Sequence, residues 1–216
     1  MHTLKLSFIC LTFLCAIVSA QAQATFQNLN FEAAKIIRDQ SSPYYPYAVN
    51  STNALPGWTV LDGLVPPSDI LYNSVLIGGG GQTAVSIHDT NDAFGFTPLQ
   101  GNYSVFFQGG VIAQTGQILN TAHSLTFWSS YSTGLQVTFN GQAIPYLALG
   151  SGANYTVYGG DISSFAGQTG ELSFSGGGFL DNIQFLSSPV PEPTSLALFG
   201  VGTLLLGFYR RRNSSL

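Results

Sequence analysis

Cysteine is scarce in this sequence of 216 residues, and its position is informative. The two cysteines, Cys10 and Cys15, both lie in an apolar segment near the start. The rest of the chain therefore offers no disulfide, no thiolate nucleophile and no cysteine ligand for a metal ion. Neither cysteine follows a small residue at a cleavage point, which argues against attachment of a lipid there.

Basic residues are also scarce, with 6 Lys and Arg against 10 Asp and Glu. Between residues 25 and 188 only 2 basic residues, Lys35 and Arg38, oppose 9 acidic ones, which leaves a formal charge of −7. Because binding to nucleic acid requires basic residues that neutralise phosphates, this composition excludes nucleic acid as a partner. Low charge with abundant Gly, Ser, Thr, Asn, Gln and aromatic residues is typical of an extracellular β-rich domain.

The first 24 residues have the layout of a secretory signal peptide. One lysine precedes an apolar run, Leu6–Val18, which small residues follow. The run is too short to cross a ~30 Å hydrocarbon core, so we predict a signal peptide over residues 1–24, exported by the secretion translocon. Cleavage is expected after Ala24, with Ala20 and Ala22 as alternatives. An uncleaved membrane anchor is the competing interpretation.

The other end combines a proline-rich segment, an apolar segment and a basic cluster. Residues 187–195 contain Val190-Pro191-Glu192-Pro193, residues 196–209 carry no charge, and residues 210–216 begin with Arg210, Arg211 and Arg212. Alternate prolines keep a linker extended. As a helix, the apolar segment reaches about 21 Å, which is marginal for spanning a bilayer. We expect a short transmembrane helix, with the arginines stopping transfer on the cytoplasmic side.

This C-terminal arrangement closely resembles the PEP-CTERM sorting signal of Gram-negative bacteria that make exopolysaccharide. The resemblance covers Val190 to Leu216, and motif, apolar segment, basic cluster and chain end occur in the expected order. It implies that an exosortase, a membrane-embedded processing enzyme, recognises the Pro-Glu-Pro region. An ordinary C-terminal membrane anchor remains the alternative.

Period-two alternation between the two ends predicts β-strands. Turn signals separate the alternating segments, and Asn140-Gly141 is the strongest hairpin signal among them. Further turns are expected at Gly109-Gly110, Ser132-Thr133-Gly134, Gly159-Gly160-Asp161 and Gly176-Gly177-Gly178. The alternating segments are Tyr103–Phe107, Leu125–Phe127, Leu135–Phe139, Leu172–Phe174 and Ile183–Phe185. Only Phe31–Arg38 presents a plausible short helical face. The prediction is one all-β domain over residues 25–186, built as an antiparallel β-sandwich.

The order of short motifs narrows this fold. The chain runs from Asn30-Phe31-Glu32 through Pro56-Gly57-Trp58 and Gly101–Val105 to Phe179–Ile183. This order resembles the galactose-binding-like jelly roll of carbohydrate-binding modules and bacterial surface domains. The resemblance places Glu32 and Asp181 where the first and last strands lie close, and it implies a structural calcium ion bound by these carboxylates. The alternative is that Glu32 is an exposed edge residue and that Asp181 caps a turn.

His88, Asp89 and Asp92 form the remaining polar cluster. A histidine with a neighbouring carboxylate can act as a general base, but no Gly-x-Ser-x-Gly signature accompanies them, and sequence leaves undecided whether Ser86 reaches His88. A solvated turn over residues 89–92 is the favoured interpretation. Without cysteine or a paired-histidine motif, zinc catalysis has no support.

Aromatic residues are candidates for contacts with a glycan, because sugar rings stack on Trp and Tyr. The candidates are Trp58, Trp128, Tyr44, Tyr45 and Tyr47, and core packing is the competing role for each tryptophan. In the Phe127-Trp128 pair one ring is expected to point inward and the other outward.

These observations favour a non-enzymatic protein of the cell envelope, outer surface or extracellular matrix, sorted at its tail and associated with exopolysaccharide or biofilm. A carbohydrate-binding module that recognises a specific glycan is the second hypothesis. A glycan hydrolase would need two carboxylates at a defined separation, and no spacing in the sequence identifies such a pair.

Overall fold

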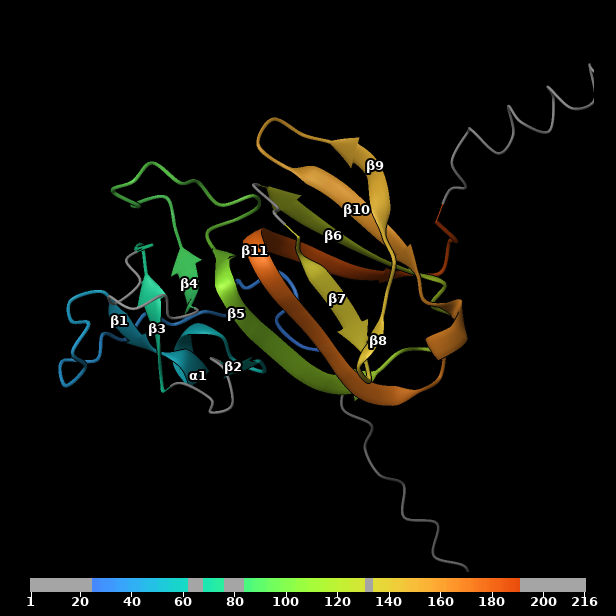
Figure 1. Cartoon of the computed structure of the whole chain (residues 1–216), viewed down its shortest axis with the longest axis horizontal. Helices are drawn as coiled ribbons and strands as arrows, with labels where there is room; N and C mark the ends of the chain where they lie inside the picture. Colours follow the sequence, from blue (N-terminus) through green and yellow to red (C-terminus); the bar gives the residue numbers. More distant parts are fainter. Residues whose placement is uncertain (1–24, 62–67, 76–83, 131–133, 191–216) are drawn as a thin grey trace, which may run out of the picture.

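The computed structural model describes residues 25–61, 68–75, 84–130 and 134–190. Within these ranges the chain is almost entirely β-sheet (Figure 1), and helix is limited to α1 (Ser51–Ala54) and one 3-10 turn (Ser163–Phe165). No helix of the described ranges is long and apolar enough to cross a membrane. The predicted signal peptide, apolar C-terminal segment and arginine cluster lie outside the described residues.

Eleven described strands form one continuously hydrogen-bonded sheet that folds back on itself. They are β1 (Ala48–Asn50), β2 (Thr59–Leu61), β3 (Asp69–Tyr72), β4 (Ala84–His88), β5 (Ser104–Gln117), β6 (Ser124–Ser130), β7 (Gln136–Phe139), β8 (Gln142–Ala143), β9 (Leu147–Ser151), β10 (Thr156–Asp161) and β11 (Thr169–Leu186). The prediction of an all-β chain is confirmed. The ladders are antiparallel except for β3 and β4, which pair in parallel.

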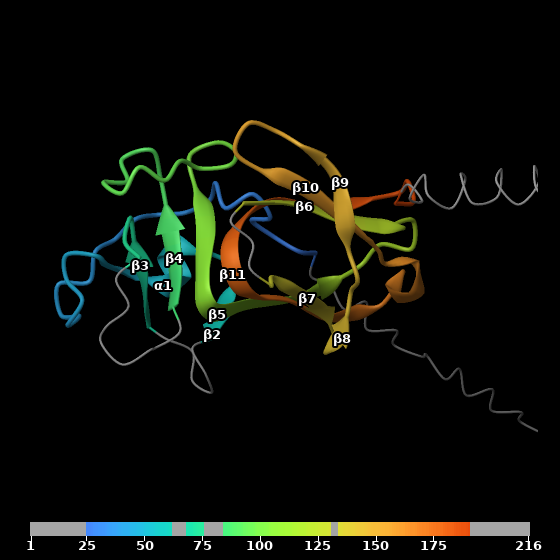
Figure 2. The same ribbon diagram turned by 45° about the horizontal axis from the view of Figure 1, so that its top comes forward.

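Two long strands, β5 and β11, pair along most of their length and belong to both layers of the sheet. The first half of β5 and the last half of β11 belong to a large layer with the strand order β1-β3-β4-β5-β11-β6-β10-β9. The second half of β5 pairs with β2, the first half of β11 pairs with β7, and β8 extends this second layer. Figures 1 and 2 show both long strands curving through the middle of the molecule.

Glycines mark the place where β5 and β11 bend from one layer into the other. The register between the strands shifts between Ser175 and Gly177, opposite Gly109 and Gly110. Gly109, Gly176 and Gly178 have positive φ, which residues with a Cβ rarely adopt. The prediction of turns at Gly109-Gly110 and at Gly176–Gly178 is therefore wrong. The glycines form a bulge that bends two strands, and each strand continues beyond it. Gly159–Asp161 likewise lies inside β10.

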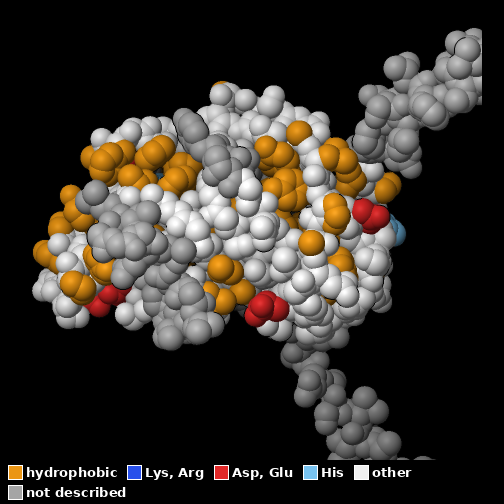
Figure 3. Space-filling view, in the orientation of Figure 1, with side chains coloured by type: hydrophobic (Ala, Val, Ile, Leu, Met, Phe, Trp, Pro, Cys, Tyr) orange, Lys and Arg blue, Asp and Glu red, His pale blue; other side chains and the backbone are white. Residues whose placement is uncertain are grey.

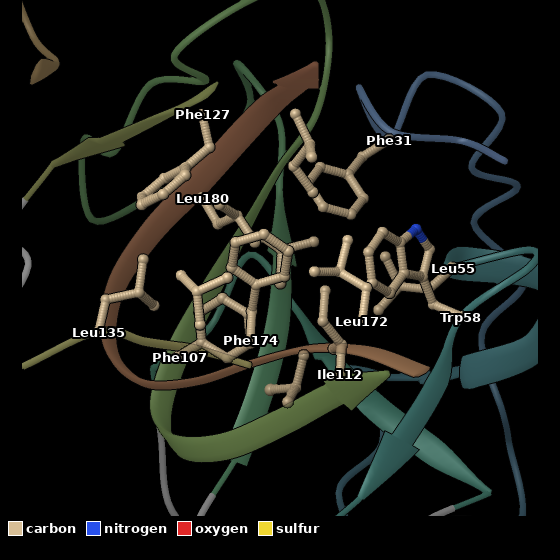
Figure 4. Close-up of a cluster of buried hydrophobic side chains, with 14 of the residues drawn as sticks. Phe31, Leu55, Trp58, Phe107, Ile112, Phe127, Leu135, Leu172, Phe174 and Leu180 are labelled. Atoms are coloured by element: carbon tan, nitrogen blue, oxygen red, sulfur yellow. The ribbon is translucent and has the colours of Figure 1, made fainter. Parts of the chain in front are cut away.

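The hydrophobic core lies between the two layers. Figure 4 shows aromatic and aliphatic side chains from β5, β6 and β11 meeting Trp58 and Phe31. All five predicted alternating segments coincide with strands, although Tyr103 and Leu135 lie one residue before β5 and β7. Their inward-facing members are buried, or half-buried at Tyr103 and Phe185, as period-two alternation predicts for a half-buried strand.

The predictions for local structure had mixed outcomes. Asn140 and Gly141 both have positive φ and join β7 to β8 in a two-residue hairpin, as predicted. The short helix considered at Phe31–Arg38 does not form. Lys35 donates its backbone N–H to the carbonyl of Asn53, and Arg38 forms an isolated bridge with Val49, so this segment extends the edge of the sheet. The predicted turn at Ser132–Gly134 lies mostly outside the described residues.

Candidate functional site

The outer face of the large layer carries the polar and aromatic residues of interest. Alternate residues of a strand point to opposite faces, and the register between strands selects those that lie together. From β4 to β6, the face away from the core carries Ser86, His88, Ser104, Phe106, Gln108, Phe179, Asp181 and Trp128. The loop 89–103 crosses this face and touches the β9–β10 hairpin (Figure 2), where Asn154 donates to Pro98.

His88 is fully buried on this face and bonded at both ring nitrogens. Its Nε2 lies 2.8 Å from Ser86 Oγ, and its Nδ1 is bonded to the Asp92 carboxylate. Burial lowers the pKa of His88, although the hydrogen bond and charge of Asp92 oppose this shift. A neutral ring therefore donates from Nδ1 to Asp92 and accepts the Ser86 hydroxyl proton at Nε2.

The three hydrogen-bonded side chains of Ser86, His88 and Asp92 are connected like a nucleophile and its base, but a substrate cannot reach them. Ser86 is only 1% exposed. The rings of Phe96, Phe106 and Phe179 lie edge-on to the imidazole, with centroids 5.6, 5.8 and 5.3 Å away. A serine nucleophile must reach a substrate carbonyl, and these rings surround the histidine instead. These three side chains therefore form a buried polar network in which each hydrogen-bonding group has a partner.

Asp89 is the centre of a separate hydrogen-bond network. Its carboxylate accepts from Tyr72 Oη and Asn73 Nδ2, each at 2.6 Å, and from both nitrogens of Asn91. Burial alone would raise the pKa of Asp89, but these donors outweigh it and lower the pKa. The residues Asp89–Asp92 do form a turn, as expected, but Asp89 and Asp92 are largely buried rather than solvated.

Glu32 and Asp181 converge on one segment, Gln100–Ser104. Glu32 Oε1 accepts the backbone N–H groups of Asn102 and Tyr103, at 2.8 and 3.1 Å. Glu32 Oε2 accepts Asn102 Nδ2 at 2.8 Å. Asp181 Oδ2 accepts the backbone N–H of Gln100 and the hydroxyl of Ser104, at 3.0 and 2.7 Å. The two ends of the folded body therefore hold the same stretch of backbone.

Asp181 is completely buried, and burial raises the pKa of its carboxyl group to about 7. Donors from Ser104, Asn182 and Gln100 work in the opposite direction, and the nearby charge of Glu32 raises the pKa further. A carboxylate in such surroundings is costly to ionise unless every oxygen has a partner. Both oxygens of Asp181 do have one, since Asn182 N–H binds Oδ1 at 2.7 Å.

This arrangement does not fit the calcium ion implied for Glu32 and Asp181. Calcium takes six to eight oxygen ligands, whereas the groups around these carboxylates are N–H and O–H donors whose positive ends point at the oxygens. Among the described residues no group of three or more His, Cys, Asp or Glu is placed to hold a metal ion. The alternative for Asp181, a cap on backbone N–H groups, describes what the structure shows. Glu32 is not the exposed edge residue of that alternative, because it is half-buried and also accepts backbone N–H groups.

Trp58 is a core residue and not a surface for a glycan. Its side chain is 5% exposed and packs against Phe31 and Phe174, with ring centroids 6.0 and 6.2 Å away. Its Nε1 donates to the carbonyl of Asn28 at 3.1 Å. A buried ring with a satisfied N–H has no face left for a sugar, so the competing role in core packing is the correct one.

Trp128 points outward while Phe127 points into the core, as the strand alternation predicts. The Trp128 ring stacks on Tyr155, with centroids 3.9 Å apart and planes inclined by 6°. Both rings are partly exposed. Sequence reasoning missed Tyr155, because its place beside Trp128 follows from the pairing of β6 with β10.

The three tyrosines before β1 are exposed, with Tyr45 the most open at 52%. Tyr44 and Tyr47 are similarly accessible, and Ile37 lies exposed in the neighbouring edge segment. The Tyr45–Pro46 peptide bond is cis. Among the candidates for glycan contact, these tyrosines and the Trp128–Tyr155 pair are therefore the ones that solvent can reach.

A pocket at the bend of β5 and β11 was not foreseen from sequence. Its described lining is Phe106, Phe107, Gln108, Gly109 and Gly176–Gly178. The glycine runs that sequence reasoning assigned to turns were the available signal, because residues without a side chain also leave space at a surface.

Fold and site together define a β-sheet protein whose polar residues hold its backbone in place and whose last strand leads directly into the proline-rich segment. Residues 189–213 match the family described as the PEP-CTERM protein-sorting motif. The matched range includes the predicted motif Val190–Pro193 and the cluster Arg210–Arg212, so this resemblance is confirmed. No curated protein matches the chain significantly.

The sorting motif implies export toward the cell envelope of a Gram-negative bacterium and an exosortase as the processing partner. Of the motif residues, Val190 lies within the described ranges, directly after exposed Pro189. Pro191, Glu192 and Pro193 lie outside the described residues, as do the cleavage candidates Ala22 and Ala24.

Proposed function

We propose that this chain is a non-enzymatic protein of the cell envelope or extracellular matrix, processed by an exosortase and associated with exopolysaccharide. The observation that carries the proposal is the sorting motif at residues 189–213. The burial of Ser86 and His88 supports the non-enzymatic role, because a substrate cannot reach this serine–histidine pair.

The position of the motif relative to β11 favours processing without loss of the fold. β11 ends at Leu186, and Ser124 Oγ donates to the carbonyl of Ser188 at 2.7 Å. Pro189 is exposed just beyond this last contact. Cleavage after the Pro-Glu-Pro region would therefore remove none of the described strands and would release an intact body.

The surface composition suits an extracellular protein in a hydrated glycan layer. On the face seen in Figure 3, hydrophobic side chains outnumber acidic ones, and no Lys or Arg is visible. A body with a formal charge of −7 and so few cations would repel strongly acidic polymers unless salt screens the repulsion. The exopolysaccharide that it joins is accordingly a neutral or weakly charged one.

Tail processing gives the direct test. Intact-mass analysis of the protein from its native host is expected to show loss of residues after the Pro-Glu-Pro region, together with loss of the signal peptide. A Glu192→Ala variant should accumulate with its tail attached, while Glu171→Ala, an exposed change in the body, should be processed normally. An intact C-terminus in the wild-type protein would refute the sorting step.

For the finer architecture we infer a galactose-binding-like jelly roll. Its support is the two-layer arrangement, with Glu32 near the start and Asp181 near the end binding one segment. Determination of an experimental structure and comparison of its strand order with that fold would test this.

A carbohydrate-binding module is the second candidate function, favoured by the partly exposed Trp128–Tyr155 stack. Aromatic faces of this kind bind the apolar face of a sugar ring. A glycan array should then lose signal with Trp128→Ala and Tyr155→Ala. Equal binding by both variants and the wild type would remove this surface from consideration.

A further inference from the structure

The sorting motif begins almost directly after the last residue that the folded body holds. Ser124 Oγ donates to the carbonyl of Ser188 at 2.7 Å. Pro191 follows Ser188 by three residues, and Pro193 follows it by five. Because an extended chain spans at most about 3.6 Å per residue, these prolines lie within about 11 and about 18 Å of Ser188. An enzyme that acts on the motif therefore works beside the surface of the body.

Three strands meet where the tail leaves the body: the start of β6, the end of β10 and the end of β11 (Figure 1). Ser124, the first residue of β6, pairs with Asp161 on one side and with Leu186 on the other. The loops before β6 and after β10 lie beside this point. We define the exit surface as four exposed residues of these loops and strand ends: Leu119, His123, Asp161 and Ser163.

Hydrogen bonds fix the exit surface in one arrangement. Asp161 Oδ1 accepts the backbone N–H of Ser163 at 2.8 Å, and Ser163 Oγ lies 3.2 Å from His123 Nδ1. The turn before His123 is closed by a bond from the N–H of Ala122 to the carbonyl of Leu119 at 3.0 Å. A surface that is already ordered binds a partner with a smaller loss of conformational entropy.

The first described residues of the body reach the same end of β11. The Phe26 ring stacks on the Phe185 ring, with centroids 5.0 Å apart, and Ile183 donates its backbone N–H to the carbonyl of Leu29 at 2.9 Å. The predicted signal-peptide cleavage after Ala24 lies two residues before Phe26. The export machinery and the sorting machinery therefore both approach the body near the end of β11.

Leu119 gives the exit surface an apolar centre. Its side chain is 56% exposed, whereas the preceding Ile118 is 1% exposed and belongs to the core. An apolar side chain with polar neighbours is the arrangement found in protein–protein contacts. One exposed leucine is ordinary by itself, and what distinguishes Leu119 is its place at the exit of the tail.

We infer that the exit surface is a docking site for the exosortase that processes the tail. The enzyme binds the motif and contacts Leu119 and its polar neighbours at the same time, because the short connection from Ser188 brings the body against it. The contact lasts only while the tail is being processed, so a small interface suffices. The inference rests on the proposed function for the partner and deepens it, since the exit surface lies outside the matched residues 189–213.

The test is pulse-chase labelling in the native host, which measures the rate at which the full chain loses its tail. Leu119→Glu places a charge at the centre of the exit surface and should slow tail loss about fivefold or more, the effect of one lost interface contact. Phe94→Glu is the matched control, because Phe94 is 53% exposed and lies in the loop 89–103, which binds Asn154 at the other end of β10. It should be processed at the wild-type rate.

An insertion tests the docking site without changing any residue of the body. Twelve Gly and Ser residues between Pro189 and Val190 let the motif move up to about 40 Å further away. Tail loss should slow by about fivefold, because a longer connection lowers the effective concentration of the surface beside the bound motif. Leu119→Glu should have little further effect in the inserted chain, since two changes that remove one contact are not additive.

Two results would overturn the inference: the insertion leaves the rate unchanged or raises it, or folded Leu119→Glu loses its tail as fast as Phe94→Glu. The processed protein is expected not to bind vesicles of phosphatidylethanolamine and phosphatidylglycerol. Vesicle binding that Leu119→Glu abolishes would also overturn it, because the lipid surface would then be the occupant. A wild-type chain that never loses its tail would instead refute the sorting step.

Discussion

Glu32 and Asp181 bind neighbouring residues of one short segment, although they lie near opposite ends of the folded body. Glu32 accepts the N–H of Asn102, and Asp181 accepts the N–H of Gln100. The segment leads into β5, the strand that pairs with β11. Two acidic residues thus fix the start of a central strand and join the first and last parts of the chain.

Replacing Glu32 tests this link. Glu32→Ala removes the acceptor of the Asn102 and Tyr103 N–H groups, which water can replace at this exposed to part-buried site, and we expect a loss of about 0.5–1.5 kcal/mol in the free energy of unfolding. Glu32→Gln keeps one oxygen and should lose less. Denaturant unfolding provides the measurement, with Glu171→Ala as the exposed control. Equal stability of Glu32→Ala and the control would contradict the role assigned to Glu32.

The raised pKa of Asp181 predicts a specific pH dependence. In the unfolded chain this carboxyl ionises near its ordinary pKa of 3.8, and in the folded protein near about 7. Between these values the folded state retains a proton that the unfolded state has released. The free energy of unfolding therefore falls as pH rises from about 4 to about 7, and this contribution is level above pH 7.

A comparison of the wild type with Asp181→Asn isolates that contribution. The amide of Asn does not titrate. The free energy of unfolding of the wild type, relative to that of Asp181→Asn, should therefore fall by about a few kcal/mol between about pH 4 and about pH 7. His88 titrates in both proteins and cancels from the difference. A pH-independent difference would show that Asp181 ionises at its ordinary pKa in the folded protein.

Removal of calcium should have no effect on stability at this site. The carboxylate oxygens of Glu32 and Asp181 already accept N–H or O–H donors. Melting temperatures with a chelator and with excess Ca²⁺ are expected to agree. A rise in melting temperature with Ca²⁺ that Glu32→Gln abolishes would show that the implied calcium site exists after all.

The two tryptophans should respond differently to substitution by phenylalanine. Trp58→Phe removes buried volume and one of the two donors to the carbonyl of Asn28, which keeps the N–H of Phe31, so a loss of about 1–4 kcal/mol is expected. Trp128→Phe keeps an aromatic ring against Tyr155 on a partly exposed surface and should lose less than about 1 kcal/mol. Chemical unfolding of both variants tests the contrast, and a larger effect at Trp128 would reverse the assignment.

Local patterns succeeded where each residue acts through its immediate neighbours. Alternation identified the strands around Phe107, Phe127 and Phe174, and Asn140-Gly141 identified a hairpin, because strand faces and tight turns depend on short-range geometry. The turn predicted at Gly176–Gly178 was wrong because it, too, was inferred from short-range geometry alone. A local pattern cannot distinguish a turn that reverses the chain from a bulge that bends a strand, since the distinction depends on the partner strand.

The sequence by itself determined the sorting motif at residues 189–213, the absence of cysteine from the body, its acidic charge and its β-rich class. These features depend on composition and on linear order. Only the tertiary structure decided that Ser86, His88 and Asp92 form a buried chain and that Trp58 lies in the core. It also decided that Glu32 and Asp181 hold backbone N–H groups, because burial and partners are set by strands that meet from distant parts of the chain.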